Sequence, residues 1–176
     1  MASLKIVEAG NDPKGVLCRK AESVKGDYPQ ELVSDMVKTM GDNWGLAAPQ
    51  VGRSLRLFVV NGNLTRKGRP LVFINPELTQ GSTTFKSDEG CLSLLDEDGN
   101  PKPFQVERPR EIRITFTDED GVRRTLGKRD LRLLARKGKE GLRNLIRTIC
   151  HECEHLDGVL IKWLGEKLSG SQKDPL

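Results

Sequence analysis

Apolar residues recur with helical spacing in two parts of the chain. Residues 29–40, PQELVSDMVKTM, carry apolar side chains three or four positions apart, and Pro29 suits the first turn of a helix. The stretch from Glu140 onwards has no proline and repeats the same spacing at Leu142, Leu145, Ile146, Ile149 and Leu156. Gly158 is well placed to end that helix. The pattern therefore predicts two amphipathic helices, the second of them long.

Between these helices the pattern changes to short runs of β-branched and aromatic residues. Residues 55–60, 71–75 and 111–118 form such runs, bounded by Gly, Pro or Asn, and are predicted strands. The sequence DEDG, residues 118–121, suits the turn of a hairpin. The middle of the chain is therefore predicted to be antiparallel sheet. We find no internal repeat or linker, so we expect a single domain over 1–176, with a loose tail from about 165 to 176.

The composition suggests a protein of the cytoplasm. No apolar run in the 176 residues approaches the roughly 20 needed to cross a bilayer, and the N-terminus lacks the apolar core of a signal peptide, so no membrane partner is expected. The four cysteines are too few and too irregularly spaced for a secreted disulfide framework, which favours a reducing compartment. Location in an organelle is an alternative if a transit peptide has been removed.

The net charge of +4 is mild but unevenly distributed. Basic residues greatly outnumber acidic ones between residues 123 and 147, at Arg123, Arg124, Lys128, Arg129, Arg132, Arg136, Lys137, Lys139, Arg143 and Arg147. Because no aromatic residues interleave with them, a solvated basic face is the simpler interpretation. The alternative is a surface that faces phosphate, for example a contact with the ribosome.

The sequence CHECEHLDGV, residues 150–159, contains both histidines of the chain. His151 and His155 are four positions apart, about 40° around a helix, so both imidazoles can reach one divalent ion while Glu152 reaches its bound water. Cys150 and Cys153 fall on or beside the apolar face instead. We interpret them as core residues, because a redox CxxC normally opens a helix, where the helix dipole lowers the thiol pKa.

A catalytic metal site of this kind needs a third protein ligand. In the pattern HExxHxxGxxH that ligand would stand at Ile161, which cannot bind metal. The downstream glutamate of other proteases is poorly matched, since Glu166 is only eleven residues beyond His155. Cys91, in SDEGCLSL at residues 87–94, is the remaining candidate and would complete a Cys-His-His site.

Three ordered motifs, NWGLAAPQ, EGCLS and HECEH, make the chain resemble the peptide deformylases. The resemblance implies an α+β domain with antiparallel sheets packed around a central HExxH helix. It also implies a metal held by Cys91, His151 and His155, and hydrolysis of the N-formyl group from the formyl-methionine of nascent polypeptides, releasing formate. Fe(II) is the metal that the family suggests in the cell. Ligand chemistry leaves Zn, Ni or Co open as well.

The resemblance also assigns residue roles. Metal binding lowers the pKa of water from ~15.7 to about 7, and Glu152 would take the water proton and deliver it to the departing amine. The side-chain amide of Gln50 and the backbone N–H of Leu92 would stabilise the oxyanion, at roughly 3 to 4 kcal/mol each. Trp44 and Gly45 would lie along the substrate, with Gly45 allowing a close backbone approach.

The chain departs from the family where the methionine pocket is expected. Asn144, Arg147 and Thr148 stand at positions that are usually apolar or small. Because an unpaired buried guanidinium is costly, we expect Arg147 either to turn to solvent or to face an acidic partner, and the preference for methionine to be weakened. The resemblance also pairs Glu89 with Arg108, which would orient the ligand strand. Other departures are Asn43, Leu94, Leu95, Cys150 and Glu154.

Two other functions stay open on the sequence alone. A metallopeptidase using the same helix would keep its metal after replacement of Cys91. A metal-stabilised basic RNA-binding module would be unaffected by Glu152→Gln and would bind RNA with a steep salt dependence.

Overall fold

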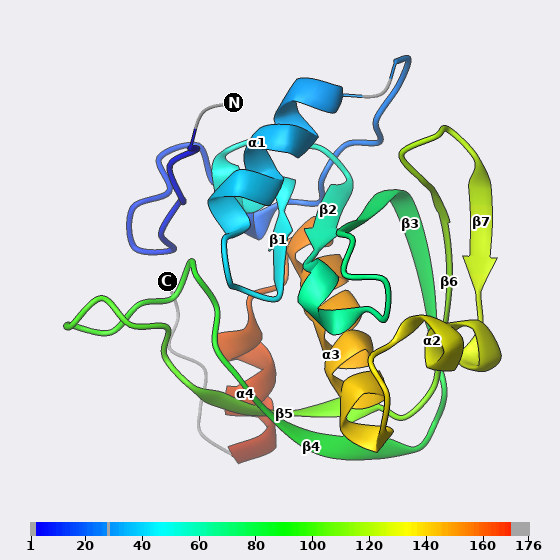
Figure 1. Ribbon diagram of the computed structural model, residues 1–176. Helices are drawn as coiled ribbons and strands as arrows, with labels where there is room; N and C mark the ends of the chain where they lie inside the picture. The colour runs from blue at the N-terminus through cyan, green and yellow to red at the C-terminus, as the bar shows by residue number, and fades with distance from the viewer. Residues whose placement is uncertain (1–2, 28, 170–176) are drawn as a thin grey trace.

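The computed structural model describes residues 3–27 and 29–169, and it contains helices and two antiparallel sheets (Figure 1). The α+β fold class is therefore confirmed. The α-helices are α1 (Gln30–Met40), α2 (Lys128–Leu134), α3 (Lys139–Leu156) and α4 (Ile161–Ser169), and the short 3-10 helices are η1 (Val16–Cys18), η2 (Ala48–Val51) and η3 (Gly62–Leu64). The strands are β1 (Gly45–Ala47), β2 (Leu57–Val60), β3 (Leu71–Gln80), β4 (Thr84–Glu89), β5 (Phe104–Pro109), β6 (Ile112–Thr117) and β7 (Arg123–Leu126).

The larger sheet has the strand order β1-β2-β3-β6-β7, and every pair in it is antiparallel. Strand β2 is buried on both faces, because successive side chains of a strand point to opposite sides. Leu57 and Val59 pack with α1 on one side, while Phe58 and Val60 join the core formed with α3 on the other. Phe58 stacks on Phe73 of β3, with ring centroids 4.6 Å apart.

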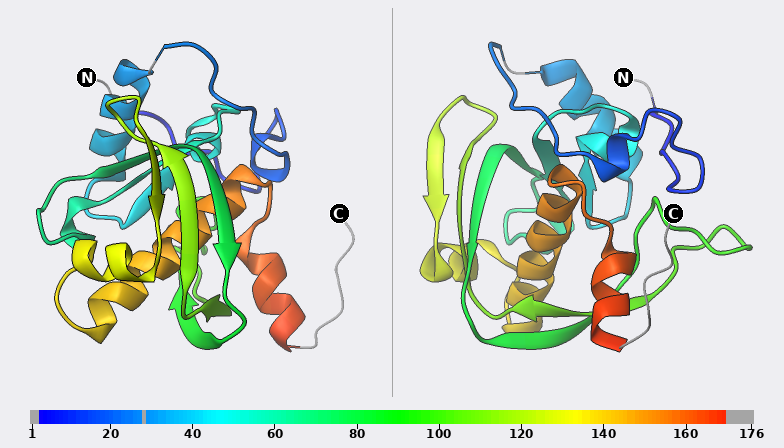
Figure 2. Two further views of the ribbon diagram at one scale, coloured as in Figure 1. Left: turned by 90° about the vertical axis from the view of Figure 1, so that its right-hand side faces the viewer. Right: turned by 180° about the vertical axis from the view of Figure 1, so that it is seen from behind.

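Helix α3 lies between the larger sheet and the ribbon formed by β4 and β5 (Figure 2). It is more enclosed than a surface helix, with ten buried residues among its eighteen. Leu145 and Ile149 face the larger sheet, and Cys150 and Cys153 belong to the same core. The helix ends at Leu156, and Gly158 then takes a positive φ of 73°. A Cβ at Gly158 would come 2.8 Å from the backbone of Arg19, so the chain turns there with no room for a side chain.

The β4–β5 ribbon brings the upstream cysteine to the helix. Cys91 follows β4 by two residues, and a turn closed by a hydrogen bond from the Leu94 N–H to the Cys91 carbonyl (2.9 Å) leads the chain away again. Strand β5 contacts both α3 and α4. Cys91 itself is buried in a third cluster with Leu17 and Leu160. Its position is therefore fixed by apolar packing as well as by the ribbon.

The predicted helices at 29–40 and from Glu140 are confirmed, as is the hairpin turn, where the Asp118 N–H donates to the carbonyl of Val122. The sequence did not predict β1, β4, β5, α2 or α4. Residues 165–169 of the expected loose tail lie in α4, while 170–176 are outside the described residues. A single domain over the whole chain stays a prediction. Within the described part of the chain, no helix is long and apolar enough to cross a membrane.

Candidate metal centre and active site

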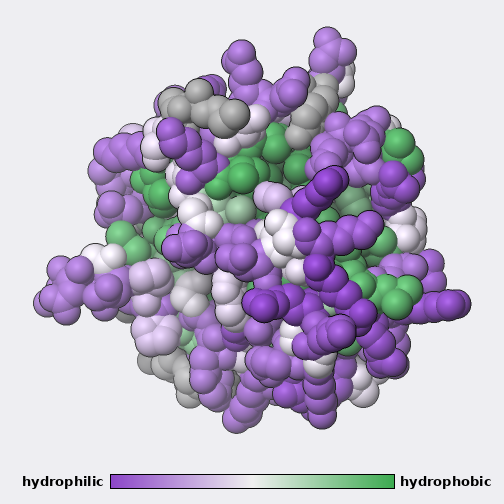
Figure 3. Space-filling view, in the orientation of Figure 1, coloured by the Kyte–Doolittle hydropathy of each residue, from purple (hydrophilic) through white to green (hydrophobic). Residues whose placement is uncertain are grey.

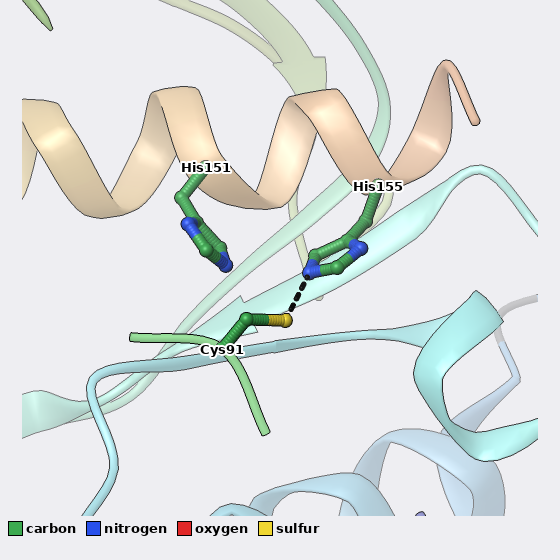
Figure 4. A group of neighbouring side chains, drawn as sticks. All are labelled: Cys91, His151 and His155. Carbon is green, nitrogen blue, oxygen red and sulfur yellow. Dashed lines mark hydrogen bonds between the residues drawn. The ribbon is translucent and has the colours of Figure 1, made fainter. Parts of the chain in front are cut away.

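Cys91, His151 and His155 meet at one point, with their side chains turned toward one another (Figure 4). One ligand atom from each residue lies within 4.8 Å of the others, and all three residues are buried. The Cys91 sulfur is 3.3 Å from Nε2 of His155. The two imidazole rings are on successive turns of α3, with centroids 5.0 Å apart. A thiol and two imidazoles at this separation are a donor set suited to a late divalent metal ion.

The two histidines act electrostatically on Cys91. Burial alone would raise the pKa of Cys91, but its interactions with His155 and His151 outweigh burial and hold that pKa well below the ordinary value. The thiolate is thus the stable form of Cys91, and a thiolate is what binds metal. Nδ1 of His155 is buried and has no hydrogen-bond partner among the described residues. The residues present therefore fit a metal ion through their donor atoms and their spacing.

A buried ion-pair network contacts His151 at the ring nitrogen that faces away from the ligand cluster. Nδ1 of His151 lies 3.2 Å from Oε2 of Glu89, which leaves its other ring nitrogen for the ligand cluster. Glu89 also accepts two hydrogen bonds from Arg108, both 2.7 Å long, which confirms the expected Glu89–Arg108 pair. Burial would raise the pKa of Glu89, but the hydrogen bonds from Arg108 and His151 lower it to about 2. Arg108 also binds both carboxylate oxygens of Glu154 on α3.

Glu152 is buried beside the ligand cluster but has a different environment. Its Oε2 atom is enclosed and has no hydrogen-bond partner among the described residues. In the metal-free chain, burial raises the pKa of Glu152 to about 7, so this carboxyl group can exchange a proton near neutral pH. Gly45 lies directly against it, since a Cβ at Gly45 would be 2.5 Å from Oε1 of Glu152. Any side chain at position 45 would displace the carboxylate.

Gln50 lies beside the Cys91 sulfur. Its Oε1 accepts a hydrogen bond from the Ala47 N–H (2.9 Å), and this bond directs the amide nitrogen Nε2 toward Cys91 and Ser93, at 3.6 and 3.5 Å. Leu92 lines the same cavity. The side-chain amide of Gln50 and the Leu92 segment are thus both next to the ligand cluster, where the sequence predicted oxyanion donors.

The cavity next to the cluster has a volume of about 340 Å³. Among the residues predicted to bind substrate, Trp44, Gly45, Arg147 and Thr148 line this cavity, whereas Asn144 does not. Arg147 is half-buried, and its guanidinium stacks on the Trp44 ring, 4.1 Å from the centroid. It forms no ion pair among the described residues, although Glu89 and Asp88 lie near enough to interact with its charge.

Two features of the site were not predicted from the sequence. Glu154 appeared only as a departure from the family pattern, yet it shares Arg108 with Glu89. Its position on α3, three residues after His151, was the available signal that it faces the same ribbon. The stacking of Arg147 on Trp44 had no such signal, since the two residues are far apart in the sequence. The interpretation of Cys150 and Cys153 as core residues is confirmed, and burial raises the pKa of Cys150 to about 12.

A thiolate, two imidazoles and a nearby buried carboxylate in an open cavity are the features of a mononuclear metallohydrolase. Comparison with known proteins narrows this class. The model of the polypeptide deformylase family matches residues 3–163, and the chain belongs to that family. Its members remove the N-formyl group from nascent polypeptides, and so does this chain.

The relatives match over most of their length. A peptide deformylase of Borreliella burgdorferi is 36% identical over 170 residues, which cover 94% of this chain and 90% of that protein. One of Agathobacter rectalis is 34% identical over 175 residues, covering 98% and 94%. The crystal structure of the Thermotoga maritima enzyme matches with a TM-score of 0.73 and 28% identity, covering 93% of this chain and 98% of the other. The Ehrlichia chaffeensis enzyme, crystallised with actinonin, gives a TM-score of 0.74 and 28% identity, covering 96% and 92%.

Replacement of Cys91 tests the ligand set. We expect Cys91→Ala to lose tightly bound metal, because only two imidazoles would remain, whereas Cys18→Ala should keep the wild-type content, since Cys18 is exposed and is not part of the ligand cluster. The measurement is metal per protein chain after gel filtration, by atomic emission. Equal metal content in both variants would contradict the Cys-His-His site and would favour the ligand arrangement of a metallopeptidase.

Proposed function

We propose that the formyl group is removed in the cavity beside Cys91, His151 and His155, with Glu152 as the residue that moves the proton. The observation that carries this proposal is the position of the Glu152 carboxylate. It is buried, has an oxygen without a partner among the described residues, lies against Gly45, and lines the same cavity as Cys91 and His151. A buried carboxylate with no ion-pair partner is expensive to maintain, which supports a chemical role for it.

Cys91, His151 and His155 would hold one divalent metal ion. When bound, such an ion lowers the pKa of water to about 7 and polarises the formyl oxygen. We propose Fe(II) as the metal in the cell, by analogy with the family. The sulfur and nitrogen donors would also suit Zn, Ni or Co. The Glu89–Arg108 pair would keep the His151 ring in the orientation that leaves its second nitrogen free for the ion.

The residues around the cavity have different proposed roles in proton transfer, oxyanion stabilisation and peptide binding. Glu152 accepts a proton from the attacking water and donates it to the amine that leaves, for which a pKa near the working pH is suited. Nε2 of Gln50, already directed toward the cluster, and the Leu92 N–H would donate to the oxygen that becomes negative as the formyl carbon turns tetrahedral. Trp44, Gly45, Arg147 and Thr148 would contact the peptide.

The Glu152→Gln variant tests the role of the carboxylate. We expect formate release from formyl-Met-Ala-Ser to fall by about 10² to 10⁴, with unchanged metal content, because the amide cannot accept the water proton. Glu140→Gln is the matched control, since Glu140 is an exposed acid on the same helix.

Wild-type activity in the Glu152→Gln variant would contradict the proposed role and would fit a binding module. Release of free amino acids in place of formate would fit a metallopeptidase.

We also propose that a basic surface around α2 contacts ribosomal RNA. The structure adds residues of the η3 loop to this surface, since Arg66 binds the carbonyls of Arg132 and Ala135. Strongly hydrophilic side chains gather over α2 on the face shown in Figure 3. We call this surface the α2 patch. Its members are exposed, and they are Arg66, Lys67, Arg69, Arg129, Arg132, Arg136, Lys137 and Lys139.

Three basic residues near the α2 patch form ion pairs with acids. Arg123 pairs with Glu77, Arg124 pairs with Asp118, and Lys128 pairs with Glu111. Within the part of the chain that the structure describes, Arg132 and Arg136 have no ion pair. The charges of Arg132 and Arg136 are therefore available for phosphate.

Two double variants with the same change in net charge distinguish a contact through the α2 patch from a general effect of charge. We expect Arg132→Glu with Arg136→Glu to abolish co-sedimentation with ribosomes at low salt, because both charges face solvent unpaired. Arg123→Glu with Arg124→Glu changes the net charge equally on β7 and should weaken sedimentation much less. In the wild type, binding should fall steeply as salt rises. Equal losses in the two double variants would contradict a contact through the α2 patch.

A further inference from the structure

Arg147 places a guanidinium group inside the cavity, one turn of α3 before His151. The side chain is half-buried, and its guanidinium carbon lies 4.1 Å from the centroid of the Trp44 ring. A cation stacked on an aromatic face in this way is held in a defined plane. Trp44 and Arg147 together form a polar wall of the cavity, next to Thr148.

The hydrogen bonds of Arg147 use only part of its donors. Nη1 donates to the backbone carbonyl of Asp88 at 3.0 Å and to Oγ of Ser87 at 3.3 Å. Nε is buried and has no partner among the described residues. Burial lowers the pKa of Arg147, and the nearby charges of Glu89, Glu140 and Asp88 only partly offset that effect. An arginine has five N–H groups, so donors remain for a ligand.

The distance along the helix suits the first side chain of a formyl peptide. Arg147 and His151 are separated by four residues, about 6 Å along the helix axis. In a formyl peptide, the α-carbon of the first residue is two bonds from the formyl carbon. A side chain of four or five heavy atoms that starts there can span a helical turn. Its end would then reach the wall formed by Trp44 and Arg147 while the formyl group lies at the ligand cluster.

The charges of the cavity favour a neutral partner for Arg147. Asp42, Asp88 and Glu89 line the same cavity, so an additional carboxylate would be repelled. A purely hydrocarbon side chain would instead cover the guanidinium without satisfying its donors, and unsatisfied buried donors are costly. The partner that avoids both costs is a neutral group with an acceptor oxygen, such as an amide or a sulfoxide.

We propose that Arg147 is a specificity-determining residue that favours formyl peptides whose first side chain ends in a neutral hydrogen-bond acceptor. This inference rests on the proposed function of the same cavity. Glutamine and methionine sulfoxide both carry such an oxygen on a side chain of suitable length. In nascent chains, whose first residue is methionine, the sulfoxide is the form that carries it.

Matched substrates test this preference. Formyl-Gln-Ala-Ser and formyl-norleucine-Ala-Ser have first side chains of equal length but differ in the acceptor, and the same holds for the sulfoxide and thioether of formyl-Met-Ala-Ser. We expect the ratio of kcat/KM, acceptor over non-acceptor, to exceed one in the wild type for at least one pair. In Arg147→Leu that ratio should fall about tenfold. The two pairs distinguish the amide from the sulfoxide.

Arg143→Leu is the matched control, because it removes the same charge one turn earlier on α3 from an arginine that lies over Phe85 and does not line the cavity. Each ratio is measured on one preparation, so partial unfolding of a variant cancels. A wild-type preference for norleucine and the thioether, or ratios that Arg147→Leu leaves unchanged, would overturn the inference alone. Failure to release formate from any peptide, formyl-Met included, would overturn the proposed function as well.

Discussion

The buried guanidinium of Arg108 is the interaction on which the site depends. Only 2% of its side chain is exposed, and it binds Glu89 on the β4–β5 ribbon and Glu154 on α3 at once. Breaking a buried pair of this kind usually costs about 3 to 5 kcal/mol, because the partner charge is left without compensation. The network therefore fixes the ribbon against the helix. As a consequence, Cys91, two residues beyond Glu89, lies next to His151 and His155.

The same network sets the charges of the site. Arg108 holds Glu89 ionised, with a pKa of about 2, and Glu89 in turn binds His151. Glu152 is the residue after His151 on α3 but faces the cavity, where it forms no ion pair among the described residues, and burial raises its pKa to about 7. The pKa values of two carboxylates that line one cavity are thus shifted in opposite directions. One is a structural anion, and the other can exchange a proton, which is the separation of roles that acid–base catalysis requires.

The sequence predicted those parts of the molecule that depend on local spacing. The periodicity of α1 and α3 is local, and so is the placement of His151 and His155 on one side of a helix. Strands β4 and β5 were missed because TTFKSDE and FQVERP are rich in polar residues, as suits a two-stranded ribbon with exposed positions. The stacking of Arg147 on Trp44 depends on how α3 meets β1, which no local pattern encodes. Resemblance supplied the roles of Gln50 and Leu92, and packing now shows why Gln50 points at the cluster.

We propose that one metal ion in the Cys-His-His cluster makes this cavity a deformylase site. The most direct test is to titrate Fe(II) into metal-free protein under exclusion of oxygen and to follow formate release from formyl-Met-Ala-Ser. The rate should rise linearly with bound metal and level off at about one ion per chain, as expected for a single site with three protein ligands. Formate release by the metal-free protein, or no formate release with one equivalent bound, would rule out this metal-dependent site.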